Sequence, residues 1–196
     1  MRGIGLIVAL FILTLILIGS AVFMKWTTEE SEPLALFGEL PEFQFTDQSV
    51  KAFGKTEMLG KVSVVDFIFT RCKGPCPLMA VNMEQLYRDY ATNSNIQFVS
   101  ISVEPSHDTP EVLSQYAIAR GVNDDRWRFL HAPIEKVVEL SELGFKLAAD
   151  DLPGAHTTRF VLLDTLAQIR GYYSGTDTAS VAVIQADISR LTGTAR

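Results

Sequence analysis

The sequence predicts an α/β domain with a central mixed sheet flanked by helices, preceded by an apolar N-terminal helix. Two apolar runs rich in β-branched and aromatic residues, 62–69 and 96–103, are each followed by a helical pattern. Strands that alternate with helices in this way usually pair in parallel. Two further strand-like runs, 158–163 and 168–173, are joined by a short turn and predict an antiparallel hairpin.

The N-terminal apolar run predicts a membrane anchor. Residues 3–24 contain no charged residue and consist mostly of Leu, Ile, Val and Phe. At ~1.5 Å per residue such a run crosses a hydrocarbon layer of ~30 Å, so we expect a transmembrane helix within residues 1–26. A cleaved signal peptide is the alternative, because positions 19–21 hold the small residues that signal peptidase needs. Its apolar core would usually be shorter, ~7–15 residues.

Charges on the two sides of this run predict its orientation. Arg2 precedes it, whereas Glu29, Glu30 and Glu32 follow it. The positive-inside rule then places the N-terminus in the cytoplasm and the domain on the outer side. No Arg- and Ser-rich transit segment precedes the run, so we expect a single-pass protein of the bacterial inner membrane that faces the periplasm.

A tether and one acidic domain follow the anchor. Residues 27–39 are acidic and lack a clear period, which predicts a tether, and residues 40–196 are long enough for one core. Phe43 and Phe45 alternate with polar residues and predict a first short strand. Leaving out Arg2, the chain has 16 basic and 23 acidic residues, a formal charge of −7 that argues against a nucleic-acid partner.

The remaining elements are predicted from local signals. Thr109 and Pro110 are an N-cap and a first helical residue. In the helix that begins at residue 77, we expect Leu78, Val81 and Leu86 to face the core. The expected helices are 77–90, 110–120, 134–143 and 178–191, and a further short strand is expected at 127–130.

The two cysteines of the chain form the candidate site. Cys72 and Cys76 lie between the end of a buried strand and the start of a helix, whose N-terminus favours thiolates. Four residues apart near a first helical turn, they share a face and can chelate a soft ion or close a disulfide. A structural disulfide or two buried free thiols is the other interpretation, although Gly74 and Pro75 in the loop argue against it.

Ligand preference favours copper over zinc at this pair. Copper(I) binds thiolate and imidazole and accepts few ligands, whereas zinc would need two further ligands here. Three histidines could complete the site. His107 lies in a loop before a helix, His131 follows a strand end, and His156 lies in a loop that leads into the strand 158–163. Each of them could also be merely structural.

At these residues the chain resembles the SCO/SenC family, the membrane-anchored copper proteins that help to assemble cytochrome c oxidase. Several blocks are similar in type, order and spacing, and together they cover nearly the whole outer domain. They are Phe69-Thr70-Arg71-Cys72 with Cys76-Pro77, the run FVSISVEPSHDTPEVL at 98–113, the Trp segment at 127–130, and His156-Thr157 with the strand FVLLD at 160–164.

The resemblance implies a thioredoxin-like fold and a copper site. It makes Cys72, Cys76 and His156 the ligands of one copper ion per chain, either Cu(I) or Cu(II) with a further weak ligand. It also implies a metallochaperone whose partner is the copper-site subunit of cytochrome c oxidase or another copper chaperone. The chain departs from the family at Ala155, where members often have an acidic residue, and at Glu104, where they commonly have Asp.

A rival function follows from Asp66. Val65-Asp66-Phe67 lies six residues ahead of Cys72 and resembles thioredoxin, in which a buried Asp behind the cysteines relays protons. Asp66 is expected to be half-buried with a raised pKa, and either accepts a thiol proton or caps a backbone group. The rival is therefore a thiol–disulfide oxidoreductase that reduces cysteines of a partner. A peroxidase is a third hypothesis, with Arg71 as a weak candidate for the activating residue.

Overall fold

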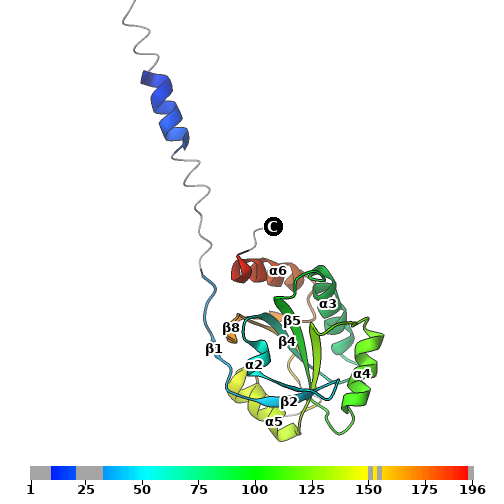
Figure 1. Cartoon of the computed structure of the whole chain (residues 1–196). Coiled ribbons are helices and arrows are strands. Elements are labelled where there is room, and N and C mark those ends of the chain that lie inside the picture. The colour runs from blue at the N-terminus through cyan, green and yellow to red at the C-terminus, as the bar shows by residue number, and fades with distance from the viewer. Residues whose placement is uncertain (1–9, 21–32, 150–151, 154–155, 194–196) are drawn as a thin grey trace, which may run out of the picture. The chain divides into compact units, whose positions relative to one another are not determined.

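The computed structural model describes residues 10–20, 33–149, 152–153 and 156–193 and divides the chain into two compact units, Met1–Pro33 and Leu34–Arg196 (Figure 1). In the first unit, residues 10–20 are helical, and the rest of the expected anchor at 3–24 lies outside the described residues. Within the described part of the chain, no helix has the length and apolar character needed to cross a membrane.

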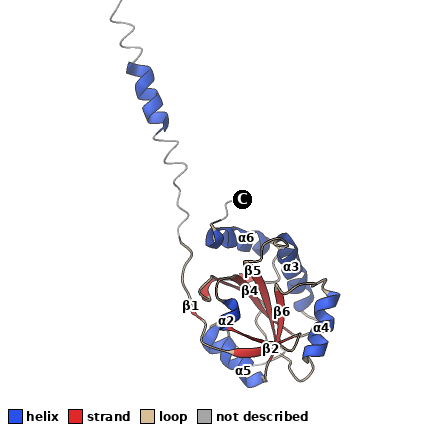
Figure 2. Ribbon diagram, viewed as in Figure 1, coloured by secondary structure: helices blue, strands red, loops and turns tan. Residues whose placement is uncertain are grey.

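The described residues of the second unit form one eight-stranded mixed sheet in the order β1-β8-β7-β4-β5-β6-β2-β3 (Figure 2). β4, β5 and β6 are parallel, β7 is antiparallel to β4, and β8 is antiparallel to β7. The strands are β1 (Gly38–Glu39), β2 (Gln44–Asp47), β3 (Ala52–Gly54), β4 (Val62–Ile68), β5 (Ile96–Ser102), β6 (Trp127–His131), β7 (Arg159–Leu163) and β8 (Gln168–Ser174).

Helices cover both faces of the sheet and bury two apolar cores. One core receives side chains of α3, α4 and α6, and the other receives side chains of α2, α5 and η1. β4 is buried along its whole length, and its successive side chains enter the two cores in turn, as strand geometry requires. The helices are α2 (Lys55–Met58), α3 (Cys76–Asp89), α4 (Pro110–Ala119), α5 (Ile134–Glu139), the π-helix η1 (Leu140–Gly144) and α6 (Ala179–Thr192).

The buried face of α3 differs from the expected one. Leu86 is buried as expected, but Leu78 and Val81 are 45% and 50% exposed, and Met79 and Met83 occupy the core instead. The reason is the phase of the helix, because Cys76 is its first residue and points inward. Residues three, seven and ten positions further along then share its face.

Other differences concern short elements. β1, β3 and α2 were not expected, and β1 lies in what we expected to be the tether. The expected helix 134–143 is α5 followed by η1, in which the Phe145 N–H donates to the Leu140 carbonyl at 2.9 Å. The N-cap at Thr109 is confirmed, since its side chain accepts a hydrogen bond from the Val112 N–H.

Candidate metal centre

Three elements bring the candidate ligands together. Cys72 lies in the loop after β4, Cys76 is the first residue of α3, and His156 precedes β7. β7 pairs antiparallel with β4, with Val65 opposite Val161. Continuing this register carries His156 to the end of β4 from which the cysteine loop departs, although His156 and Cys76 are 80 residues apart.

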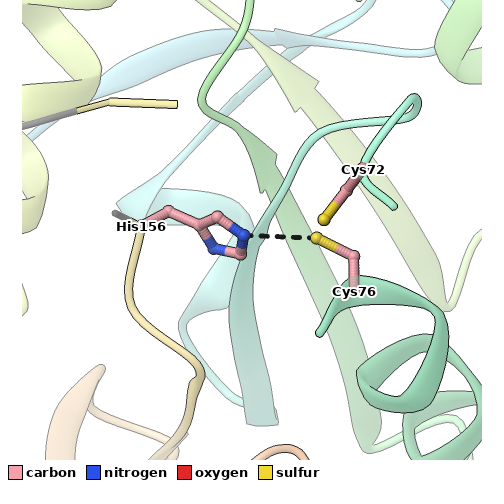
Figure 3. A group of neighbouring side chains, drawn as sticks. All are labelled: Cys72, Cys76 and His156. Carbon is pink, nitrogen blue, oxygen red and sulfur yellow. Dashed lines mark hydrogen bonds between the residues drawn. The ribbon is translucent and has the colours of Figure 1, made fainter. Parts of the chain in front are cut away.

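Figure 3 shows both thiols and the imidazole facing one point. The two Sγ atoms and a ring nitrogen of His156 lie within 4.8 Å of one another, and Cys76 Sγ is 3.2 Å from His156 Nε2. Both cysteines are free thiols. Cys76 and His156 are buried, whereas Cys72 is partly exposed, so this arrangement is reached from solvent on the Cys72 side.

The imidazole is held with its ligand nitrogen toward the thiols. His156 Nδ1 lies 3.0 Å from the Thr157 carbonyl oxygen, which can only accept, so Nδ1 carries the proton and Nε2 keeps its lone pair. The Phe69 ring packs edge-on against the imidazole, with centroids 5.4 Å apart. Burial, the largest influence, lowers the pKa of His156, so the ring is neutral and suited to bind a metal at neutral pH.

Cys76 does not behave as its place at a helix N-terminus suggested. Burial is the main cause that raises its pKa, to about 12, and the neighbouring Cys72 thiol adds to it. The metal-free form therefore holds a protonated Cys76 at neutral pH. A bound soft cation would have to displace this proton, which couples metal binding to proton release.

The loop that carries Cys72 is contacted by the loop that follows β5, through Arg71 and Glu104. The Arg71 guanidinium makes two hydrogen bonds to Glu104, of which Nε to Oε2 is 2.7 Å. Arg71 lowers the pKa of the Glu104 carboxyl. In the sequence, Glu104 stands out only as a departure from the family, and Arg71 only as a weak candidate for the activating residue of a peroxidase. Finding this pair requires knowing that the C-terminal ends of β4 and β5, which precede Arg71 and Glu104, lie side by side.

Asp66 is more deeply buried than expected. Its side chain is 1% exposed, Ser100 Oγ donates to Asp66 Oδ1 at 2.6 Å, and Trp127 Nε1 donates to Ser100 Oγ at 3.0 Å. Burial, the main cause, raises the pKa of Asp66 to about 7. Among the described residues, no hydrogen bond joins Asp66 to either thiol.

The other histidines lie outside the ligand group. Of the His, Cys, Asp and Glu residues in the described ranges, only Cys72, Cys76 and His156 form a cluster able to hold a metal. His131 Nδ1 lies 2.9 Å from the Asp108 carbonyl, and His107 belongs to the loop between β5 and α4. Ala155, the expected departure beside His156, lies outside the described residues.

The chain is similar to proteins of known family and structure. The family model for SCO1/SenC matches residues 36–193. The crystal structure of a SCO1/SenC family lipoprotein from Bacillus anthracis str. Ames superposes with a TM-score of 0.73 at 34% identity, covering 83% of this chain and 98% of that one. This likeness confirms the mixed α/β, thioredoxin-like fold of the second unit.

Two further solved structures bear on the site. BsSco, a member of the Sco family of cytochrome c oxidase assembly proteins in which a disulfide switch was identified, has a TM-score of 0.73 and 25% identity over 82% of this chain and 98% of its own. Bradyrhizobium japonicum ScoI, solved with copper bound, has a TM-score of 0.65 and 21% identity over 78% of this chain and 99% of its own. Because ScoI is only 21% identical to this chain, its likeness shows the fold alone.

Asp66 should make the folded protein less stable as pH rises. Its folded pKa of about 7 lies above the unfolded value of ~3.9, so the folded state keeps a proton that the unfolded state releases. The stability that this proton contributes is complete below about pH 4 and is lost as pH rises through about 7. Between pH 5 and pH 8 we expect a loss of about 2–3 kcal/mol from this group.

Denaturant unfolding of the full chain at both pH values tests this expectation. Asp66→Asn serves as the comparison, because both proteins share every other titrating group, and the difference between their profiles isolates Asp66. Parallel pH profiles for the two proteins would contradict a raised pKa at Asp66.

Proposed function

Since this chain belongs to the SCO1/SenC family, we propose that it binds one copper ion through Cys72, Cys76 and His156 and passes it on during assembly of cytochrome c oxidase. The observation that carries the proposal is the convergence of two thiols and a neutral imidazole within 4.8 Å. Support also comes from the place of BsSco, 25% identical, among the cytochrome c oxidase assembly proteins of the Sco family.

The donor set suits Cu(I). Two thiolates and one imidazole make a three-coordinate site of the soft ligands that Cu(I) prefers, and Cu(II) would take a further weak ligand. His156 offers the Nε2 lone pair, and Cys76 must lose its proton on binding. Cys72, the more exposed thiol, is where an incoming thiolate of a partner can begin a stepwise exchange of ligands. The acceptor would be the copper-site subunit of the oxidase or another copper chaperone.

Anaerobic titration of the reduced full chain with Cu(I) tests the site. We expect about one tightly bound ion per chain, with affinity reduced by more than about tenfold in Cys72→Ser, Cys76→Ser and His156→Ala, since each removes a ligand. His107→Ala is the matched control, because its imidazole is exposed and lies outside the ligand group. Unchanged affinity in both Cys72→Ser and His156→Ala would refute the copper site.

A thiol–disulfide oxidoreductase is the second candidate function, favoured by two free thiols beside each other and by the buried Asp66. In that reaction the Cys72 thiolate would attack a partner disulfide and release one partner thiolate. Cys76 would then attack the mixed disulfide, leaving a Cys72–Cys76 disulfide and a reduced partner. The oxidised pair binds no copper, so the two functions exclude each other at any one moment.

Trapping separates this function from copper binding. Cys76→Ser should accumulate a mixed disulfide between Cys72 and its partner, because the second attack is blocked, and Cys72→Ser should accumulate far less. The measurement is non-reducing electrophoresis of membranes from cells that express each variant. Absence of a mixed disulfide in both variants would argue against reductase activity.

The apolar segment 3–24 and the charges around it support a place in the bacterial inner membrane, with residues 40–196 in the periplasm. A reporter enzyme that is active only in the periplasm, fused at the C-terminus, should be active and should sediment with membranes. The same fusion without residues 3–24 should lose both properties. A reporter that stays active and soluble in both fusions would exclude the anchor.

A further inference from the structure

The carboxylate of Asp108 is fully buried beside the cysteine loop. It lies in the loop between β5 and α4 and is 0% exposed. It accepts hydrogen bonds from Thr70 Oγ1 at 2.5 Å, from the Thr70 backbone N–H at 3.1 Å, and from Ser102 Oγ at 2.7 Å. Thr70 is 38 residues away in sequence and lies two residues before Cys72.

Hydrogen bonds, and not an ion pair, satisfy this carboxylate. Among the described residues, no basic side chain forms a salt bridge with Asp108, unlike the buried Asp47 and Asp164, which pair with arginines. A buried carboxylate is costly unless donors surround it, and bonds to a charged acceptor are the stronger kind. The donors nearest to Asp108 are therefore held firmly, and two of the three belong to Thr70.

The other side of Asp108 is itself fixed. Its backbone N–H donates to the Glu104 carbonyl at 2.9 Å, and its carbonyl lies 2.9 Å from His131 Nδ1. The next residue, Thr109, caps α4. Asp108 thus joins the cysteine loop to three elements that do not carry a ligand: β5, α4 and β6.

Thr70 lies inside the turn that presents Cys72. The Cys72 N–H donates to the Phe69 carbonyl at 3.2 Å, so residues 69–72 form one tight turn. Within this turn, Arg71 also pairs with Glu104 through two hydrogen bonds, but the Arg71 side chain is 61% exposed. Thr70 is itself half-buried, and its partner, the Asp108 carboxylate, is fully buried.

We propose that Asp108 is a positioning residue of the metal centre, whose buried carboxylate anchors Thr70 and thereby sets where Cys72 stands relative to Cys76 and His156. The proposal rests on the proposed copper function for its first measurement. It also predicts a property of the metal-free thiol pair, which can be measured whether or not copper is the ligand.

The first measurement is Cu(I) affinity of the full chain, by anaerobic competition with a Cu(I) chelator. Asp108→Asn replaces one acceptor oxygen by a donor, so it should lower affinity by roughly 10–100-fold, as loss of a ligand-supporting partner does. Thr70→Val should also lower it, because the hydroxyl is lost at constant shape, and Thr70→Ser should restore it. Asp164→Asn is the matched control: its carboxylate is also buried and holds a turn, at the far end of β7 from His156.

The second measurement is the equilibrium constant for forming the Cys72–Cys76 disulfide against dithiothreitol, in the metal-free chain. Releasing the loop lowers the effective concentration of one thiol near the other, so Asp108→Asn and Thr70→Val should lower this constant by about fivefold or more. Thr70→Ser and Asp164→Asn should leave it near the wild-type value.

The outcomes separate a positioning role from a structural one. Asp164→Asn should lose stability but keep the wild-type Cu(I) affinity and disulfide equilibrium constant. If Asp108→Asn behaves in the same way, the proposal is overturned. If Asp108→Asn fails to fold, Thr70→Val against Thr70→Ser decides, and equal values for those two overturn it. If wild type binds no Cu(I), the copper function fails, while the disulfide constants still test Asp108.

Discussion

The pairing of β7 with β4 is the constraint on which the site depends. β4 lies between the parallel β5 and the antiparallel β7, so its C-terminal end meets both the end of β5 and the approach to β7. The loop with Cys72, the support from Glu104 and Asp108, and the loop with His156 all meet at this edge. A shift of one residue in the β4–β7 register would turn the core side chains of β7 to the wrong face, so core packing also fixes the place of His156.

Cys72, Cys76 and His156 differ in their exposure and in what holds them, and this difference fits the proposed delivery of copper. Cys76 and His156 are buried and oriented by the helix, the Thr157 carbonyl and the Phe69 ring. Cys72 is the most accessible of the three and lies on a loop held by polar contacts. Two of the three side chains are thus enclosed, and the third is open to solvent. The high pKa of Cys76 also means that a metal ion bound there would displace a proton.

Much of this architecture could be predicted from local patterns, because the long elements carry strong ones. The apolar runs of β4 and β5 and the cap at Thr109 are such signals. Very short elements such as β1, β3 and α2 have no period to detect. The exposed face of α3 was misjudged because Leu78 and Val81 seemed better core residues than Met79 and Met83, whereas the inward direction of Cys76 decides the phase.

The sequence pointed to the three side chains that the structure brings together, but not to the residues that hold them in place. The resemblance to a family predicted that His156 lies near the cysteines. The antiparallel register of β7 on β4 supplies the physical reason. Contacts such as Arg71 with Glu104 and Thr70 with Asp108 join loops more than 30 residues apart, and they depend on a strand alignment that no single segment encodes. Asp66 stood out as a polar residue in an apolar run and through its likeness to the buried Asp of thioredoxin. These signals predicted its raised pKa but not its hydrogen bond from Ser100.

The chain of hydrogen bonds from Trp127 through Ser100 to Asp66 has an optical consequence. The chain contains two tryptophans, at 26 and 127, so only Trp127 lies in the unit that begins at Leu34. Its indole N–H donates a hydrogen bond to the Ser100 hydroxyl, which in turn donates to the buried carboxyl of Asp66. Ionisation of Asp66 therefore places a charge one hydroxyl away from the only indole of the domain. The fluorescence of Trp127 is therefore expected to change as Asp66 ionises, which needs no added label.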